Sequence, residues 1–333
     1  MKCKRVIISR YGGSEALQVV EGEIPKPRVG EARVRILAAG VAWGDILNRE
    51  GFGRARPPFT PGYDIVGVVD QLGEGVSTIT VGQMVAALPV VGGYAERICL
   101  PASELTPVPT GLDPAEAVSL VMNYVAAHQM LHRAARVRRG ERVLIHNAAG
   151  GVGTALLQLG KLAELEMYGT ASRGKHELVA NLGATPIDKE GFAERLSALA
   201  SDGVDAVFDP VGGTRLWQSY RTLQKGGRLV VYGAHSVVTE GMPKMILGFM
   251  LSSALNLLPD GRTVLNYSVT PPPYSKPAWC REDLSMLFDL LAQEKIKPVV
   301  AERMPLEEAG RAHDLLGKGA VAGKIVITPT PAN

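Results

Sequence analysis

The sequence has few cysteines, little net charge and no long hydrophobic run, and each shortage excludes a class of protein. Its three cysteines, Cys3, Cys99 and Cys280, are too widely spaced to form a disulfide framework or a metal-binding knuckle. The net charge is only +3 and no block of arginine or lysine occurs, so we expect no nucleic-acid partner. The longest apolar stretch, residues 245–258, is interrupted by glycine, serine and asparagine and is too short to span a bilayer.

The composition otherwise fits an ordinary soluble globular protein. Of the 333 residues, 46% are apolar and 21% are charged. This length is sufficient for two domains with sizeable hydrophobic cores. The first ten residues contain too short an apolar run for a secretory signal peptide, so the expected compartment is the cytoplasm.

The most informative stretch is 142–153 (RVLIHNAAGGVG). Residues 143–145 predict a strand that is buried on both faces, and 154–165 has the composition and spacing of a helix. A strand, a glycine turn and a helix in this order form an anion cradle, because glycine lets the backbone approach a pyrophosphate and the helix start directs free N–H groups at it. Ala148 replaces the first glycine of the usual dinucleotide fingerprint.

This turn predicts a dinucleotide site, and the alternative is a tight strand–helix turn that binds nothing. The expected contacts are Asn147, Gly150, Gly151, Val152 and Gly153.

The residues after the next predicted strand, 166–171, favour NADPH over NADH. An NAD site places Asp or Glu about 20 residues past the glycines, where it binds the ribose 2′-hydroxyl. This chain instead has Ser172, Arg173 and Lys175. Cationic donors fit a 2′-phosphate, which a carboxylate would repel. The alternative is that the two cations are simply solvated loop residues.

The order of the predicted elements indicates an α/β fold with two domains. Residues 1–118 are β-rich, and a helix follows over 113–133. Strands and helices then alternate, which is typical of a doubly wound parallel sheet. We expect a β-rich domain from 1–118 and 271–333 and a nucleotide domain over 119–270. The strands expected in the nucleotide domain lie at 142–146, 166–171, 185–188, 205–208, 228–232 and 264–269.

Two further loops follow buried strands of the same sheet. Ligands of such sheets bind outside the carboxyl ends of the strands, where these loops lie. The candidate cofactor contacts in them are Val211, Gly212, Tyr232 and Gly233.

Several separate motifs together resemble the medium-chain dehydrogenase/reductase superfamily, in its zinc-free quinone oxidoreductase branch. The first-domain motifs are 39–45 (AGVAWGD), 61–67 (PGYDIVG) and 92–96 (GGYAE). Within the branch the chain is most similar to the vesicle amine transport protein type. The stretches that carry this similarity are 123–124 (NY), 169–177 (GTASRGKHE), 203–213 (GVDAVFDPVGG) and 323–326 (GKIV).

The resemblance implies a GroES-like first domain, a six-stranded nucleotide domain and a homodimer that pairs the strand near 264–269 across the subunit boundary. It also implies NADPH as the cofactor, with the glycine turn, Ser172 and Lys175 among its contacts, and we add Ala42 and Lys324 as candidate contacts.

No catalytic metal is expected. In zinc-dependent relatives, Cys, His and Cys hold the metal at positions that correspond here to Ala42, Tyr63 and Met122 or Asn123, none of which is a usual zinc ligand. His128 and His132 are four residues apart on a predicted helix, which suits a ligand pair, but no third ligand is evident. We expect these histidines to be packed or surface residues.

Without a metal to stabilise an alkoxide, reduction of electron-poor acceptors is the easier chemistry. Quinones and α,β-unsaturated carbonyls accept a hydride with the charge delocalised onto oxygen, where a hydrogen bond is sufficient. The candidate catalytic residues are Asp45, Tyr63 and Tyr124, with either tyrosine as the hydrogen-bond donor. The alternative is that both tyrosines only pack.

A second hypothesis is a nucleotide-binding protein that carries an apolar ligand and has little activity. Related reductases often have Asn at the position of Ala42 and Tyr near Leu47, and both are absent here. The segment 244–258 is rich in Met and Leu, so it could line an apolar pocket or form a lid, or it could be a buried or dimer-facing helix.

Overall fold

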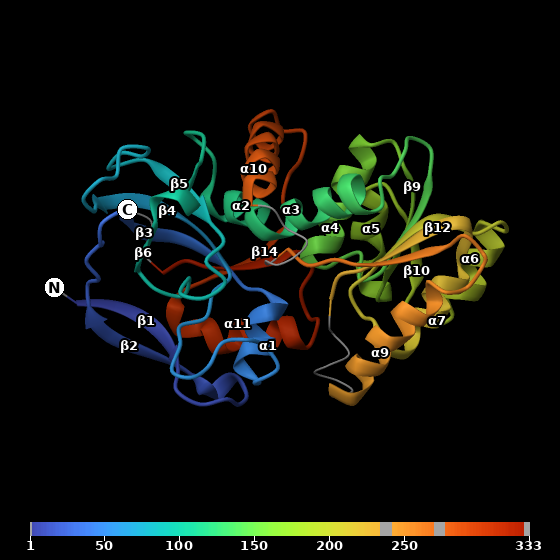
Figure 1. Ribbon diagram of the computed structural model, residues 1–333, viewed down its shortest axis with the longest axis horizontal. Helices are drawn as coiled ribbons and strands as arrows, with labels where there is room; N and C mark the ends of the chain where they lie inside the picture. The colour runs from blue at the N-terminus through green and yellow to red at the C-terminus, as the bar shows by residue number, and fades with distance from the viewer. Residues whose placement is uncertain (1, 234–241, 270–276, 330–333) are drawn as a thin grey trace. The chain divides into compact units, whose positions relative to one another are not determined.

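The computed structural model describes residues 2–233, 242–269 and 277–329 (Figure 1). The chain divides into two compact units, Met1–Val125 with Pro277–Asn333, and Ala126–Lys276. The domain boundary expected at 270/271 lies outside the described residues. In the described ranges, no helix combines the length and the apolar character needed to cross a membrane.

The second unit contains the predicted doubly wound sheet, which is confirmed as six parallel strands. Their order is β10-β9-β8-β11-β12-β13. Successive strands from β8 to β10 are added on one side, and those from β11 to β13 on the other. This switch point between β8 and β11 is where α/β sheets bind ligands. The strands are β8 (Arg142–Ile145), β9 (Glu166–Ala171), β10 (Thr185–Asp188), β11 (Val204–Asp209), β12 (Leu223–Val231) and β13 (Thr263–Asn266). β12 begins five residues earlier than the strand expected at 228–232, and β13 ends three residues before the expected 269.

Helices cover both faces of this sheet (Figure 1). On β9, Tyr168 packs into a core cluster with residues of α6, α7 and α9, whereas Met167 and Gly169 face α4 and α5. This alternation explains why strand segments of this unit are apolar on both sides. The helices are α4 (Gly151–Leu162), α5 (His176–Asn181), α6 (Phe192–Leu199), α7 (Leu216–Arg221) and α9 (Met242–Leu255), with short 3₁₀ turns η5 (Arg173–Lys175) and η6 (Gly213–Arg215).

The first unit is β-rich, and the two ends of the chain build it together. In Figure 1 the red strand β14, from the end of the chain, and the blue strand β3, from its beginning, belong to the same sheet. The order is β14-β15-β3-β4-β5-β7, β6 pairs with β3, and β1 and β2 form a separate ribbon. The strands are β1 (Lys2–Ile8), β2 (Leu17–Glu23), β3 (Glu31–Gly40), β4 (Asp64–Leu72), β5 (Met84–Ala87), β6 (Arg97–Pro101), β7 (Thr106–Pro107), β14 (Val300–Met304) and β15 (Lys324–Ile327).

Residues near the C-terminus help to close the hydrophobic core of this unit. Leu306, Ala309 and Ala312 join residues of β3, β4, β5 and β15 in one buried cluster. The helices are α1 (Trp43–Arg49), α10 (Pro277–Ala292) and α11 (Ala309–Gly317), with 3₁₀ turns η1 (Ser14–Ala16), η2 (Ala102–Glu104) and η7 (Leu306–Glu308).

The helix expected over 113–133 is present but irregular. Asp113 caps its start, where the carboxylate accepts the N–H groups of Ala115 and Glu116 at 2.9 Å. Two π-helical segments interrupt the α-helical geometry, and such turns occur frequently at functional sites. The segments in order are α2 (Pro114–Ser119), η3 (Leu120–Tyr124), α3 (Val125–His128) and η4 (Gln129–Ala134).

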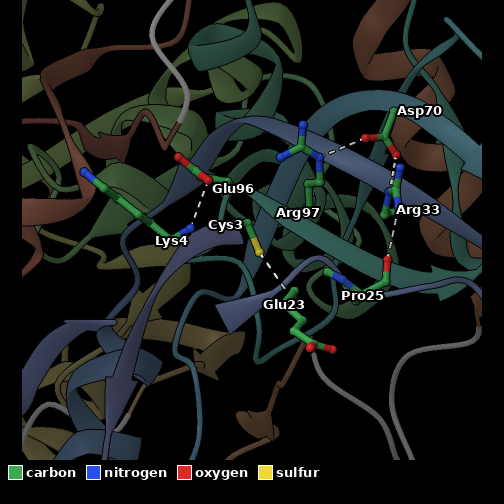
Figure 2. A network of polar contacts seen from close by, with 8 residues as sticks. All are labelled: Cys3, Lys4, Glu23, Pro25, Arg33, Asp70, Glu96 and Arg97. Carbon is green, nitrogen blue, oxygen red and sulfur yellow. Dashed lines mark hydrogen bonds and ion pairs between the residues drawn. The ribbon is translucent and has the colours of Figure 1, made fainter. Parts of the chain in front are cut away.

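A shared carboxylate ties three strands of the first unit together (Figure 2). Asp70 on β4 accepts from the Nε of Arg33 on β3 at 2.6 Å and from the Nε of Arg97 on β6 at 3.0 Å. Arg33 also donates to the carbonyl of Pro25 at 3.2 Å. All three charged side chains are partly buried, so this cluster contributes more than a solvated surface ion pair does.

Candidate functional site

The glycine turn after β8 has the geometry of an anion cradle. Asn147 adopts a left-handed conformation with φ of 52°, and Gly150 is the extended N-cap of α4. The N–H of Gly150 donates to the carbonyl of Asn147 at 2.9 Å. A Cβ at position 153 would collide with that same carbonyl oxygen, so only glycine lets the first turn of α4 approach the strand end. The N–H groups that begin α4 have no partners within the helix, and they point at the turn.

Ala148 stands at the first glycine position of the fingerprint, and the neighbouring strand explains why it fits. Its side chain is fully buried, and a Cβ built on Gly169 of β9 would come within 2.8 Å of the Ala148 methyl. The missing side chain of Gly169 therefore makes the space that the alanine occupies. The N–H of Ala148 donates to the carbonyl of Thr170 at 2.9 Å, which fixes the turn against β9.

The three residues predicted to bind a 2′-phosphate lie together on one turn at the end of β9. Ser172 precedes the 3₁₀ turn that contains Arg173 and Lys175. Arg173 is exposed and its Nε lies 3.2 Å from a carboxylate oxygen of Asp188, the last residue of β10. Burial and the positive charge of Lys189 lower the pKa of Lys175. A phosphate bound here would relieve the repulsion between the two ammonium groups.

Lys189 is a residue that the sequence reasoning missed. The parallel register pairs Asp188 with Ala171, so Lys189 follows its strand at the same edge of the sheet as Ser172. The signal was present in the sequence, since position 189 follows a strand expected at 185–188 and the carboxyl ends of parallel strands meet at one edge.

The loops after β11 and β12 are held together by Asp209. Its Oδ1 accepts the N–H groups of Val211 at 2.7 Å and Gly212 at 3.1 Å, so these two amides are already used within the protein. The N–H of Tyr232 donates to the backbone carbonyl of Asp209 at 3.0 Å. Gly233 lies directly against Pro210, where a side chain would collide with the backbone. The candidate contacts of both loops are therefore brought to one place.

In the first unit, Asp45 is a buried helix cap. Its Oδ2 accepts the N–H of Ala42 at 2.9 Å, which is the half of a capping box that the N3 side chain supplies at the start of α1, and its Oδ1 accepts the N–H of Gly62 at 2.8 Å. The hydroxyl of Tyr94 lies 3.4 Å from Oδ2. Complete burial raises the pKa of Asp45 to about 7 against the lowering effect of the two backbone hydrogen bonds. These contacts give Asp45 a structural task in fixing α1.

The two candidate tyrosines differ in their surroundings. Tyr63 is half-buried and covers Gly44, and burial raises its pKa to about 12. Tyr124 ends the first π-helical segment and is 1% exposed. Within the described part of the chain, its hydroxyl has no hydrogen-bond partner, and burial raises its pKa further above the usual value. A buried hydroxyl without a partner is unfavourable, which makes Tyr124 the better candidate for a donor to a ligand.

Lys324 is enclosed in the β-rich unit. Its Nζ lies 2.9 Å and 3.1 Å from the two carboxylate oxygens of Asp64, and both side chains are buried. Its charge is therefore neutralised by Asp64 inside the protein, and its contact with a cofactor stays a prediction.

Among the residues with assigned positions, no group of three or more His, Cys, Asp or Glu side chains has the geometry to hold a metal ion. His128 and His132 do lie side by side, with ring centroids 4.7 Å apart.

The Met-rich segment is helical, and part of it faces solvent. In α9, Leu247 and Met250 are exposed, whereas Ser252 and Leu255 are buried. Leu257, just after the helix, is also exposed. This helix is therefore only partly buried within the single chain.

Two family profiles match the chain. Residues 28–110 match the family described as alcohol dehydrogenase GroES-like domain, and residues 182–327 match the family described as zinc-binding dehydrogenase. The first match confirms the GroES-like fold expected for the β-rich domain.

Known proteins resemble the chain over nearly its whole length. The rat synaptic vesicle membrane protein VAT-1 homolog is 31% identical over 98% of this chain and 84% of its own length. Rat quinone oxidoreductase is 28% identical over 97% of each. The crystal structure of Escherichia coli quinone oxidoreductase complexed with NADPH has a TM-score of 0.87 and 26% identity, and covers 98% of this chain and 100% of that one.

Proposed function

The chain belongs to the medium-chain dehydrogenase/reductase superfamily, and on this premise we propose that it is an NADPH-dependent, zinc-independent oxidoreductase that reduces quinones or α,β-unsaturated carbonyls. The observation that carries the proposal is the pairing of a glycine cradle after β8 with a cationic turn after β9. Relatives named as quinone oxidoreductases, one of them in complex with NADPH, support it.

The residues present fit a phosphorylated dinucleotide. Gly150, Gly151, Val152 and Gly153 form the pyrophosphate cradle, because their backbone begins α4. Ser172, Arg173, Lys175 and Lys189 supply a hydroxyl and three cations for the 2′-phosphate. Arg173 would exchange its exposed ion pair with Asp188 for the phosphate at little cost, since exposed pairs contribute little.

Bound NADPH supplies a hydride to an electron-poor acceptor. The protein's task is to hold the acceptor in place and to stabilise the charge that develops on its oxygen. We assign that hydrogen bond to the hydroxyl of Tyr124, whose donor is otherwise unused in the described structure. We propose that Tyr63 lines the substrate pocket. Asp45 and Ala42 support the site indirectly, because they fix the start of α1.

Metal removal is expected to leave the activity unchanged. At the positions that hold zinc in zinc-dependent relatives, this chain has Ala42, Tyr63 and Met122 or Asn123, which are not usual zinc ligands. Exhaustive dialysis against a strong chelator should therefore preserve both turnover and melting temperature, and elemental analysis should find less than stoichiometric zinc. Loss of activity that added zinc restores would contradict zinc independence.

The proposed function is tested by binding and turnover in parallel. We expect NADPH to bind more tightly than NADH in a fluorescence titration, and NADPH absorbance to fall when quinones or short and long enones are added. Equal affinities for the two dinucleotides would contradict the 2′-phosphate site. Tight NADPH binding with no turnover on any acceptor would contradict the reductase.

That last outcome would favour a second candidate function, a nucleotide-binding carrier for an apolar ligand. The exposed Leu247 and Met250 of α9 support it, because exposed apolar side chains on one helix suit an apolar partner. A lipid-transfer assay between vesicles separates the two functions. The same helix, together with the outermost strand β13, also fits the homodimer that we propose for this chain.

A further inference from the structure

Four buried polar side chains of the second unit form an unbroken hydrogen-bonded chain. His146 follows β8, and its Nδ1 lies 3.0 Å from Oγ1 of Thr170 on β9. Its Nε2 lies 3.1 Å from Oγ of Ser219 on α7. Ser219 donates to Oδ2 of Asp209 at 2.8 Å. All four residues are at most 6% exposed, so water does not compete for these bonds.

The proton directions in this hydrogen-bonded chain follow in turn from its Asp209 end. Ser219 donates to Asp209, so the single hydroxyl proton of Ser219 is used there. The oxygen of Ser219 must then accept from His146, which requires a proton on Nε2, and a neutral ring carries no second proton on Nδ1. Nδ1 is left as an acceptor for the hydroxyl of Thr170. Burial lowers the pKa of His146, which agrees with a neutral ring.

Both ends of the chain hold backbone that belongs to the proposed cofactor site. The N–H of Asn147, in the glycine turn, donates to Oγ1 of Thr170 at 3.3 Å. At the other end, the carboxylate of Asp209 holds the amides of Val211 and Gly212. The hydrogen-bonded side chains thus link the turn after β8 to the loop after β11. The switch point of the sheet lies between these two strands.

This position separates the two halves of a dinucleotide. The pyrophosphate belongs at the start of α4, and the adenosine half extends toward β9, where Ser172 and Lys175 lie. The nicotinamide half must then extend the other way, over the loop after β11. The rings of Phe192 and His146 pack in a T-shaped arrangement with their centroids 4.7 Å apart.

We propose that the Thr170–His146–Ser219–Asp209 chain is a positioning device that sets the loop at Val211 and Gly212 relative to the glycine turn, and so places the nicotinamide half of the cofactor. The inference rests on the proposed function. His146, Ser219 and Asp209 are positioning residues, since they act on the cofactor through the backbone that they hold.

The Ser219→Ala variant tests the proposal, because it cuts the chain at its centre with the loss of one oxygen atom. We expect its dissociation constant for NADPH to rise about tenfold, because the loop at Val211 and Gly212 would then hold its binding position for only about a tenth of the time. Its affinity for adenosine 2′,5′-bisphosphate, which carries only the adenosine half, should be unchanged. Equal losses for both ligands would indicate a general loss of structure and would overturn the proposal, as would unchanged NADPH binding.

A matched control is Ser119→Ala. Ser119 is as buried as Ser219, but its hydroxyl donates only to the Ala115 carbonyl of its own helix. This variant should bind both ligands like the original protein. A second pair acts at Thr170: Thr170→Val removes the hydroxyl with little change of shape, and Thr170→Ser restores it. We expect the serine variant, but not the valine variant, to keep full NADPH affinity.

Nitrogen NMR of the histidine side chains tests the chain without any ligand. His146 should give the signals of a neutral ring protonated on Nε2, and Ser219→Ala should change them. The opposite tautomer would overturn the proton directions. If the original protein fails to bind NADPH in the same titrations, the proposed function falls and the inference with it. If it binds and the Ser219 and Thr170 variants bind equally well, only the inference falls.

Discussion

Replacing Lys175 with glutamate is expected to reverse the preference for NADPH over NADH. The change removes an ammonium and places a carboxylate on the turn where Ser172 and Arg173 also lie. A 2′-phosphate carries nearly two negative charges, so an attraction becomes a repulsion. Solvent screens the remaining repulsion at this partly exposed site, so we take the loss of the charge-assisted hydrogen bond, about 3 kcal/mol, or on the order of 100-fold in the dissociation constant of NADPH. Affinity for NADH, which has a neutral hydroxyl there, should change little.

The measurement is a pair of fluorescence titrations, one for each dinucleotide, at two ionic strengths. The preference of the original protein for NADPH should shrink as salt is added, because the site is partly open to solvent. Lys161→Glu is the matched control, since Lys161 lies in the last turn of α4, at the opposite end from the cradle. It makes the same change in net charge and should leave both affinities unchanged. A similar effect of both variants would reduce the 2′-phosphate site to a general attraction by net charge.

This half of the proposed site could be assembled from the sequence because its residues are local. The cradle lies within one strand–turn–helix unit, and Ser172 and Lys175 follow the next strand directly. The strands at 166–171 and 185–188 have the predicted bounds, since each has polar, glycine or proline residues at its ends. Lys189 was missed because the reasoning followed a single loop, whereas the edge of a parallel sheet gathers residues from several.

Features that depend on burial could not be predicted in the same way. Asp45 and Lys324 are charged residues, and nothing in their local sequence says that one is enclosed as a cap and the other as the partner of Asp64. Their burial depends on strands that are distant in sequence, which supply the compensating contacts. The π-helical segments around Tyr124 are likewise invisible to a pattern with the ordinary helical period.

The polar chain from Thr170 to Asp209 belongs to the same class. Its four members come from the ends of β8, β9 and β11 and from α7. Thr170, Asp209 and Ser219 lie 24, 63 and 73 positions after His146 in the sequence. Each of them taken singly is an ordinary polar residue near a strand or in a helix. Only the sheet order, which places β8 between β9 and β11, brings them into contact.

Replacing Tyr124 with phenylalanine is expected to stabilise the protein while it lowers the activity. The Tyr124 hydroxyl is buried and has no hydrogen-bond partner among the described residues. Its removal should therefore raise the free energy of unfolding by about 1 kcal/mol, since no buried polar group is then left unpaired there. The melting temperature should therefore rise by a few degrees. If this hydroxyl is the donor to the acceptor oxygen, kcat/KM for quinones and enones should fall on the order of 100-fold, as for the loss of one such donor elsewhere. NADPH affinity should not change.

Tyr94→Phe is the matched control, because Tyr94 is equally buried but its hydroxyl is used. It lies 3.2 Å from Nε2 of His313 and 3.4 Å from Asp45, so its removal leaves polar partners unpaired and should destabilise the fold by about 1–3 kcal/mol. The two variants make the same chemical change and should move the melting temperature in opposite directions. A destabilised Tyr124→Phe protein with normal turnover would mean that the hydroxyl has a structural partner, and the donor would have to be sought at Tyr63. Stabilisation combined with lost turnover is the pattern of a group kept for its ligand, since the fold alone gives no reason to bury it.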